Sequence, residues 1–562
     1  MSVVNVASLR KAAAAFAALA LCLLAGAVAA AAQSPRPNVV VIMTDDQTVD
    51  DLVAMPATRR AFIRHGVMFD NSTVSYPVCC PSRATYLTGR YAHNHGVMGL
   101  YLPTGGYGRF NDQDALPVWL QRAGYRTAHI GKYMNGYGSD RPAIVPPGWA
   151  DWYGAVDPTT YRMWNYTLNE NGRQVTYGGL SEEDPANYQT DVLRNKALDV
   201  IRRDSHSGQP FFLSVAFLAP HYEEGAVRAR TRVTVRSAPR HRGRFATLPL
   251  PRPPGFNERD RSDKPGFMRR FKALDGTAIG RITAEFRARR ESLLAVDEAV
   301  AAIVRELTAQ GALSNTYLLF TSDNGYLQGE HAVPSGKMLP YDPSTKVPLL
   351  IRGPGIRGRR MSREPVSNID LAPTILQIAG ASAFGGAPID GRSLLKFAKQ
   401  PKLRSERLVL HETGGLRATS LQPEESDEGP IPVRPVRTYR AVRNDRWLYV
   451  VYRSGERELY DLERDPAQLR SRHRDLRYVA TKRALQVELD RLATCRGRAC
   501  RLPGEPIPDP LDRATHTLTN SRNQRSATGP RAIRDAGDRE AVQRAAPRPV
   551  DDGPPGLAHQ PT

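Results

Sequence analysis

Four apolar runs, each followed at once by polar residues, constrain the fold of this chain most strongly. They span residues 38–43, 125–130, 210–218 and 317–321. The first, NVVVIM, is uninterrupted and rich in β-branched residues, as in a strand that is buried on both faces. Helical patterns at 116–123, 187–203 and 284–310 alternate with the runs. This alternation predicts an α/β fold in which helices sandwich a large, mostly parallel mixed sheet.

The residues that follow these runs are the kind that bind ligands. They are Thr44-Asp45-Asp46, Gly131-Lys132, Ala219-Pro220-His221 and Ser322-Asp323-Asn324-Gly325. Ligands of open α/β sheets collect beyond the carboxyl ends of the strands. We therefore expect these side chains to converge on one crevice.

The segment Cys79–Gly89 (CCPSRATYLTG) predicts a short helix with reactive groups at its start. Pro81 suits the first helical turn, where its missing N–H costs nothing, and Gly89 suits a left-handed cap. Arg83 lies one turn beyond Cys79, so the guanidinium faces the thiol end of the helix. A thiol and a guanidinium on one short turn indicate an active site.

Two acidic loops indicate a site for a hard cation. The adjacent carboxylates of Asp45 and Asp46 repel one another unless a positive charge lies between them. Asp323 and Asn324 supply two further oxygen ligands from another strand end. Oxygen ligands favour Ca²⁺ or Mg²⁺ over a softer metal, and a large, irregular oxygen shell favours Ca²⁺.

The N-terminal segment predicts that the protein is exported. Residues 1–33 combine Arg10 and Lys11, an apolar run and a small-residue end, which predicts a cleaved secretion signal and no stable membrane span. A retained membrane anchor is the alternative.

The chain has 5 cysteines; Cys495 and Cys500 enclose a turn and are expected to form a local disulfide. Adjacent Cys79 and Cys80 would be strained as a disulfide.

The formal net charge of +21 is unevenly distributed. The segment from Arg228 to Lys272 contains fourteen Lys and Arg residues against three acidic ones. In an exported protein such a segment would attract a sulfated polysaccharide or an anionic cell envelope and not nucleic acid. A solvated loop of an arginine-rich protein is the alternative.

The sequence divides into a larger and a smaller unit. We expect a catalytic domain at 34–395 and an α+β subdomain at 396–502, with hairpin strands in 438–452 and 458–462 and a helix at 479–492. The remaining residues, 503–562, have almost no aromatic residues and predict a disordered tail.

Seven motifs together resemble the sulfatase family of the alkaline-phosphatase-like superfamily. In chain order they are PNVVVIMTDDQ from Pro37, CCPSR from Cys79, GKYMNGYG from Gly131, APH from Ala219, TSDNGYLQGEH from Thr321, GKMLPYDPSTKVPLLIRGPG from Gly336 and NIDLAPTILQIAG from Asn368. GKYMNGY, SDNGY and TCRGRACRLPG are similar to the branch that holds N-acetylglucosamine-6-sulfatases. The resemblance covers about 37–395, and ELYDLERDP from Glu458 is similar to the family's C-terminal domain.

The resemblance implies a mechanism and a partner in maturation. A formylglycine-generating enzyme would oxidise Cys79 to formylglycine, whose hydrate attacks sulfur. Arg83 would hold the hydrate, Lys132 and Lys337 would bind the sulfate oxygens, and His221 would protonate the departing alcohol. The cation would be held by Asp45, Asp46, Asp323, Asn324 and an oxygen at Cys79. The implied substrate is a sulfated sugar or glycosaminoglycan.

One residue departs from the family pattern. Many arylsulfatases carry a histidine two residues after the lysine that matches Lys132, where this chain has Met134. Met134 cannot transfer a proton, so His93 or His95 could assist the hydrate or could be purely structural.

Two other functions remain open at this stage. Relatives in the superfamily that hydrolyse phosphonate monoesters or phosphate diesters also use C-x-P-S-R. A catalytically silent, polyanion-binding protein would need only the positive charge.

Overall fold

The structure, a computed structural model, describes residues 36–178, 183–223, 235–385, 388–414 and 438–510. The described residues belong to one compact unit, and residues 511–562 lie outside the described part of the chain. The predicted signal at 1–33 and most of the predicted tail also lie outside them. No helix within the described ranges is long and apolar enough to cross a membrane.

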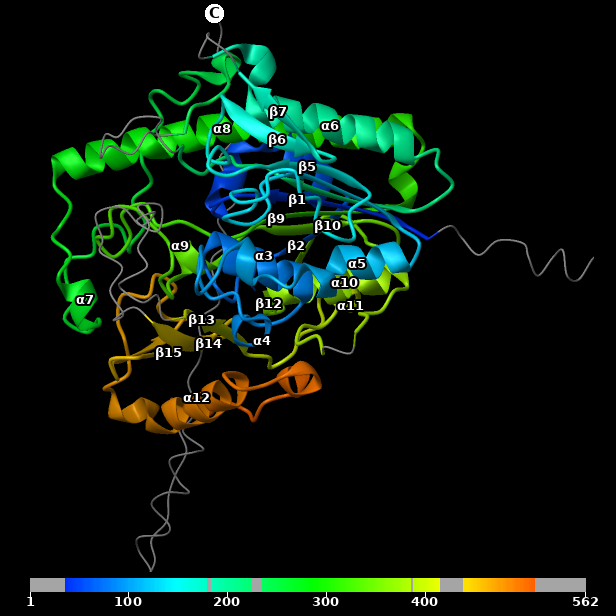
Figure 1. Ribbon diagram of the computed structural model, residues 1–562. Helices are drawn as coiled ribbons and strands as arrows, with labels where there is room; N and C mark the ends of the chain where they lie inside the picture. The colour runs from blue at the N-terminus through cyan, green and yellow to red at the C-terminus, as the bar shows by residue number, and fades with distance from the viewer. Residues whose placement is uncertain (1–35, 179–182, 224–234, 386–387, 415–437, 511–562) are drawn as a thin grey trace, which may run out of the picture. The chain divides into compact units, whose positions relative to one another are not determined.

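A large mixed sheet forms the centre of the unit (Figure 1). Its strands are β1 (Asn38–Thr44), β2 (Gly66–Phe69), β4 (Arg126–Gly131), β5 (Asp151–Ala155), β6 (Tyr166–Glu170), β7 (Arg173–Tyr177), β8 (Phe211–Ala216), β9 (Thr316–Ser322), β10 (Leu349–Arg352) and β11 (Arg360–Ser362). Among the described residues their order is β11-β2-β10-β9-β1-β8-β4-β5-β6-β7. The central strands β9, β1, β8, β4 and β5 are mutually parallel, whereas β10, β6 and β7 run antiparallel to their neighbours.

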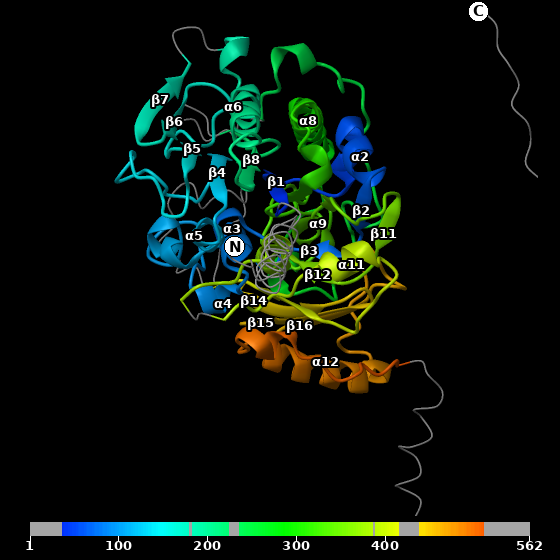
Figure 2. The same ribbon diagram turned by 90° about the vertical axis from the view of Figure 1, so that its right-hand side faces the viewer.

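Helices cover both faces of this sheet, as Figure 2 shows. On one side lie α2 (Pro56–Ile63), α6 (Gln189–Asp204) and α8 (Gly276–Ala309); on the other lie α3 (Cys79–Thr88), α5 (Leu116–Arg122) and α10 (Leu371–Ala379). Shorter helices are α4 (Ala92–His95), α7 (Gly266–Arg269), α9 (Asp342–Thr345) and α11 (Leu395–Lys399). The predicted sandwich of helices around a mostly parallel sheet is confirmed.

The uninterrupted apolar run of β1 is explained by burial on both faces. Val39 and Val41 belong to the core that contains residues of α3, α5 and α10. Val40 and Ile42 belong to the core that contains residues of α6 and α8. Successive strand side chains point to opposite faces, so a strand with no polar face is apolar at every position.

Each predicted helix and strand is present, with ends within two residues of those expected except at α8. Helix α8 begins at Gly276, before the predicted start at 284, because Asp275 caps it with a side-chain oxygen that accepts from the N–H of Ala278 at 2.8 Å. The sequence did not predict α2, α10, β2, β10 or β11, nor strands β5–β7. Their residues are interrupted by polar and aromatic side chains because β7 is a partly exposed edge strand.

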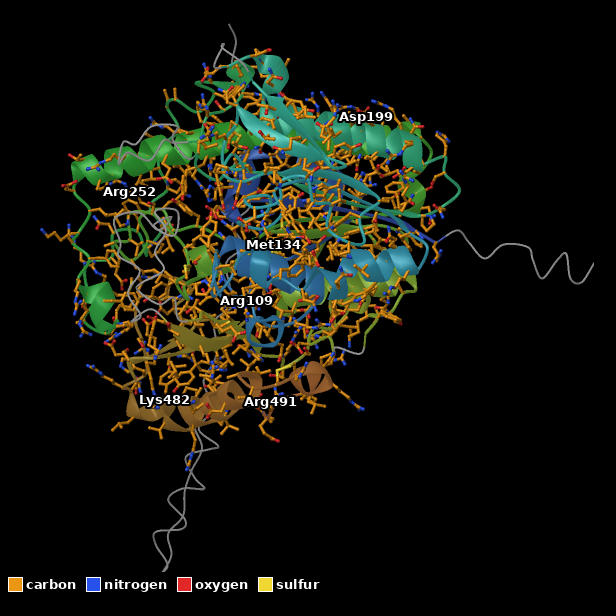
Figure 3. The ribbon with its side chains drawn as sticks, viewed as in Figure 1. Arg109, Met134, Asp199, Arg252, Lys482 and Arg491 are labelled. Atoms are coloured by element: carbon orange, nitrogen blue, oxygen red, sulfur yellow. A yellow bond between two sulfur atoms is a disulfide. The ribbon has the colours of Figure 1, made fainter. Side chains whose placement is uncertain are left out.

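A smaller antiparallel sheet follows in the sequence. It consists of β13 (Val409–Glu412), β14 (Tyr439–Arg443), β15 (Trp447–Tyr452) and β16 (Arg457–Asp461), and helix α12 (Val479–Leu492) packs on it. Figure 3 labels Lys482 and Arg491 on this helix. A separate two-stranded pair joins β3 (Ser72–Thr73) to β12 (Val366–Ser367). The predicted small α+β unit is therefore present, while its boundary at residue 396 stays a prediction.

Residues near the end of the described chain are hydrogen-bonded to α12. Cys495 and Cys500 form the predicted disulfide, with Cα atoms 5.1 Å apart. Thr481 donates to the carbonyl of Pro508 at 2.7 Å, and the N–H of Glu505 donates to Glu488 at 3.2 Å. The first residues of the predicted tail, 503–510, thus have defined partners.

Candidate active site

The two adjacent aspartates lie where β1 ends. Thr44 pairs with Ser322, so the loop after β1 and the loop after β9 begin at the same level of the sheet. Asp46 has a left-handed backbone, with φ of 66°, which breaks the alternation that would send neighbouring side chains to opposite faces. Asp45 and Asp46 are both completely buried.

The loop after β9 binds the first acidic loop directly. The N–H of Asp46 donates to Asp323 Oδ1 at 3.2 Å, and Asn324 Nδ2 donates to Asp46 Oδ1 at 2.5 Å. Asp323 and Asn324 are also completely buried. The four predicted oxygen-bearing residues therefore lie together, as expected from their positions at neighbouring strand ends.

Cys79 is the first residue of α3, after Val78 in an extended conformation. Its Sγ lies 3.4 Å from Asp45 Oδ1 and 3.1 Å from Lys337 Nζ. The start of α3 is fixed by Ser82, whose hydroxyl donates to the carbonyl of Asp323 and accepts from Asn368 Nδ2 at 2.9 Å. The helix thus holds the thiol against the acidic loops.

Arg83 joins three parts of the site. Its Nε donates to Asp323 Oδ2 at 2.8 Å, and one terminal nitrogen lies 3.3 Å from Asp45 Oδ2. The other terminal nitrogen donates to the carbonyl of Lys132 at 2.7 Å. A planar guanidinium can make these bonds at once because its donors point in fixed, different directions.

The two lysines enter from separate loops. Gly131, at the end of β4, has φ of 100°, and a Cβ there would lie 2.0 Å from the carbonyl oxygen of Ala216. Glycine therefore allows β4 to approach β8 closely and places Lys132 Nζ 2.5 Å from Asp45 Oδ2. Lys337 reaches the same cluster from the chain between β9 and α9, with Nζ 2.7 Å from Asp46 Oδ1.

His221 lies beyond the end of β8, completely buried. Its Nδ1 is 2.7 Å from the carbonyl oxygen of Tyr222, so Nδ1 carries a proton and donates. Its Nε2 is 3.7 Å from Asp46 Oδ2. Nε2 is therefore the ring nitrogen that faces the acidic cluster.

Opposite charges balance within the cluster. Three carboxylates (Asp45, Asp46 and Asp323) face three permanent cations (Arg83, Lys132 and Lys337). Burial raises the pKa of Asp46, but Lys337, His221 and Arg289 outweigh it and lower that pKa. Burial, and then Asp45, raise the pKa of Asp323 and of the Cys79 thiol. An unmodified Cys79 is thus a neutral thiol, which is a weak nucleophile.

The donor set suits a hard cation. Asp45, Asp46, Cys79 and His221 each offer a ligand atom within 4.8 Å of the others. Asp46 Oδ2 and Asn324 Oδ1 are buried oxygens that accept no hydrogen bond within the described chain. A buried oxygen without a donor is costly, and a cation would remove that cost. His221 was not in the predicted ligand set, whereas Asp323 already accepts from Arg83 and from the backbone of Asp46.

A family model described as Sulfatase matches residues 37–381, which is more than half of the chain. The chain belongs to the sulfatase family. It is 34% identical over 507 residues to the N-acetylglucosamine-6-sulfatase of Homo sapiens, a match that covers 85% of this chain and 88% of the relative. It is 33% identical over 522 residues to the arylsulfatase of Volvox carteri, with coverages of 86% and 79%.

Solved structures support the fold of this sulfatase. A protein whose structure is described as a complex with its substrate D-glucosamine-2-N,6-O-disulfate superposes with a TM-score of 0.67 at 22% identity. The superposition covers 83% of this chain and 98% of that protein. The family and the fold expected from the sequence motifs are thereby confirmed, and the protein is a sulfatase.

Two further residues contact this site, and one of them, Arg289, was not identified from the sequence. Arg289 of α8 is buried and donates to the carbonyl oxygens of Asp46 at 2.6 Å and of Pro220 at 3.1 Å. Tyr161 lies against the ring of His221, with centroids 4.8 Å apart, and 4.3 Å below Lys132 Nζ. Arg289 is one of many arginines, so no local pattern distinguished it.

The residues considered as substitutes for the family histidine lie elsewhere. Met134, labelled in Figure 3, is buried with its sulfur 3.6 Å from the sulfur of Cys80. The ring nitrogens of His93 lie 2.9 Å from Glu412 and 3.0 Å from the carbonyl of Cys495. Those of His95 lie 3.0 Å from the Thr85 hydroxyl and 3.1 Å from the N–H of Val97. Both histidines are therefore engaged by groups outside the cluster, which supports a structural role.

Proposed function

We propose that this sulfatase uses formylglycine at position 79 and a divalent cation, Ca²⁺ in preference to Mg²⁺, to remove 6-O-sulfate from N-acetylglucosamine or a glycosaminoglycan. The observation that carries the proposal is the position of Cys79. It lies at a helix start within 3.4 Å of Asp45 and 3.1 Å of Lys337, in a buried cluster of three carboxylates and three cations. The N-acetylglucosamine-6-sulfatase relative supports the substrate.

The cofactors would supply the reactive centre. Formylglycine at position 79 would provide a hydrated aldehyde as nucleophile, and a cation held by Asp45, Asp46, Asp323 and Asn324 would polarise the sulfate ester. The protein residues of the cluster are formally neutral together, so a bound dication leaves an excess positive charge that favours an anionic ester.

The chain's own residues would bind the ester and move a proton. Lys132 and Lys337, both buried, would hold the sulfate oxygens and offset the negative charge that grows during transfer. Because Nδ1 of His221 is bonded to a carbonyl, Nε2 would hold the proton that passes to the departing alcohol. Asp46 would stabilise the charged imidazole, and Arg83 would fix position 79 relative to Asp45.

The segment 1–33 supports export of this sulfatase to the periplasm, the cell envelope or the medium. We propose that conversion of Cys79 by a formylglycine-generating enzyme precedes or accompanies that export. The proposed export rests on the basic N-terminus, the apolar run and the small-residue end of this segment.

The test is sulfate release from N-acetylglucosamine 6-sulfate by protein produced in a host that converts Cys79. We expect turnover by the parent and none by Cys79→Ala. The same preparations are assayed with an aryl sulfate and an aryl phosphonate monoester. Faster turnover of the phosphonate than of any sulfate ester would refute the substrate assignment.

A further inference from the structure

The basic segment from Arg228 to Lys272 does not form one uncompensated surface. In its described part, several arginines are paired with acids of other elements: Arg236 with Glu223 and Glu183, Arg240 with Asp191 and Glu298, and Arg242 with Glu183. The positive charge of each of these three arginines is thus offset by an acidic side chain of the same protein. The expectation that the segment attracts a polyanion stays a prediction, and these pairs direct the search for an anion site to basic residues outside them.

A cavity of about 230 Å³ lies at the end of this segment. It is bounded by 263–265 and Arg269 at α7, by the turn 455–457 that joins β15 to β16, and by 473–474 before α12. None of these residues belongs to the loops that carry Cys79, Lys132, His221 or Lys337. The cavity is thus a feature separate from the active site.

The lining of the cavity is cationic. Four lysine and arginine side chains face two carboxylates, for a net formal charge of +2. Both carboxylates are already bonded: Glu456 accepts from the N–H of Gly266 at 2.7 Å, and Asp263 accepts from Lys264 at 3.2 Å and from the N–H of Ser471. Because Asp263 is paired with Lys264, the three arginines of the lining face Glu456 alone.

Three arginines of the lining retain donors for a ligand. Arg269, Arg457 and Arg474 are exposed and form no ion pair within the described ranges. One terminal nitrogen of Arg269 donates to the carbonyl of Lys264 at 2.6 Å, which fixes this side chain at the cavity. Guanidinium groups bind sulfate and phosphate oxygens with paired donors.

We propose that this cavity is a second anion-binding site that holds a sulfate group of a glycosaminoglycan chain while another unit of the chain occupies the active site. The volume is below the roughly 300 Å³ of the smallest drug-sized pockets, so the site would take one sulfated sugar unit and not a whole oligosaccharide. The inference deepens the proposed function and rests on it for the identity of the glycan.

The test measures binding without turnover. A Cys79→Ala protein is compared with the same protein carrying Arg457→Glu and Arg474→Glu, and a heparin-derived octasaccharide is titrated by calorimetry. Reversal of two exposed arginines should weaken binding by about tenfold at low salt, and the difference should shrink as salt is added. A matched control reverses two exposed basic residues on α2, Arg59→Glu and Arg60→Glu, which do not line the cavity.

The two variants distinguish binding at the cavity from nonspecific electrostatic attraction. A weakening confined to the cavity variant supports the inference, whereas equal weakening in the control, or affinity within about twofold of the parent, overturns it. Unchanged far-ultraviolet circular dichroism and melting temperature show that both variants fold.

Activity provides a second and independent comparison. In protein with an unsubstituted Cys79, the cavity variant should raise KM for the sulfated chain by about tenfold and leave kinetics on the monosaccharide sulfate unchanged. If no glucosamine sulfate is hydrolysed by the parent, the proposed substrate fails, but the calorimetric result still decides whether the cavity binds a sulfated glycan.

Discussion

Arg289 offers the sharpest test of how the active site is held together. This buried side chain donates to the carbonyls of Asp46 at 2.6 Å and Pro220 at 3.1 Å, so it links the cation loop to the residue before His221. In Arg289→Lys the positive charge remains, but the lysine side chain is shorter and its single ammonium group cannot donate to both carbonyls as the guanidinium does. One buried carbonyl then loses its donor.

The expected magnitude follows from the lost bond. A hydrogen bond from a charged donor contributes about 1.5–3 kcal/mol. If about 2 kcal/mol of this is lost from the transition state, kcat/KM falls roughly 30-fold. Because Asp46 is a proposed cation ligand, the Ca²⁺ concentration for half-maximal activity should also rise.

The assay measures sulfate release across a Ca²⁺ titration after chelation, with thermal unfolding as a check on folding. The matched control is Arg290→Lys, which makes the same substitution at the next position of α8. Arg290 contacts Asp51 at 3.4 Å and the carbonyl of Asp50 at 3.3 Å, away from Asp46. Parental kcat/KM and Ca²⁺ dependence in Arg289→Lys, or equal losses in the control, would refute the positioning role.

Four further predictions concern the reaction and stability. Cys79→Ala should abolish turnover with little change in melting temperature; residual parental activity would contradict the mechanism. His221→Asn should lower the rate by about 10²–10⁴-fold on a sugar sulfate and much less on 4-nitrophenyl sulfate, whose leaving group needs no proton; equal losses would exclude the acid role. Chelation should remove activity and added Ca²⁺ should restore it, whereas activity unaffected by exhaustive chelation would exclude the cation. Burial lowers the pKa of His93, but the bond to Glu412 outweighs burial and raises that pKa. The contribution of His93 to stability is therefore complete below its unfolded pKa of about 6.5 and is lost as the pH rises through the folded pKa. The free energies of unfolding of the parent and of His93→Gln, measured in urea across this range, should converge at high pH, and a constant difference would contradict the assignment.

Much of the fold was predictable because the central strands have no exposed face. Burial on both sides makes β1, β8 and β9 predominantly apolar, and each is followed by the polar residues that carry chemistry. Strands β5–β7 lead to the sheet edge and contain polar residues, and the edge strand β7 has exposed positions, so their pattern is weaker. The early start of α8 depends on Asp275 as a cap, a contribution that apolar periodicity does not reveal.

The active site was predictable where a motif marks its residues, most clearly at strand ends and at the start of a helix. Asp45, Asp323 and Lys132 follow buried strands, and Cys79 begins a recognisable helix. Arg289 lies in α8, far from Asp46 in the sequence, and only the tertiary fold brings the two residues into contact. The ion pairs of Arg240 likewise depend on Asp191 of α6 and Glu298 of α8, which no local pattern associates with the basic segment.

The central claim is that position 79 carries an oxidised side chain in the active enzyme. Mass spectrometry of the peptide that contains Cys79, from purified active protein, tests it directly. Conversion of the thiol to an aldehyde lowers the peptide mass by about 18 Da, and the fraction converted should follow specific activity across preparations. Full activity in protein whose Cys79 is entirely an unmodified thiol would contradict the account.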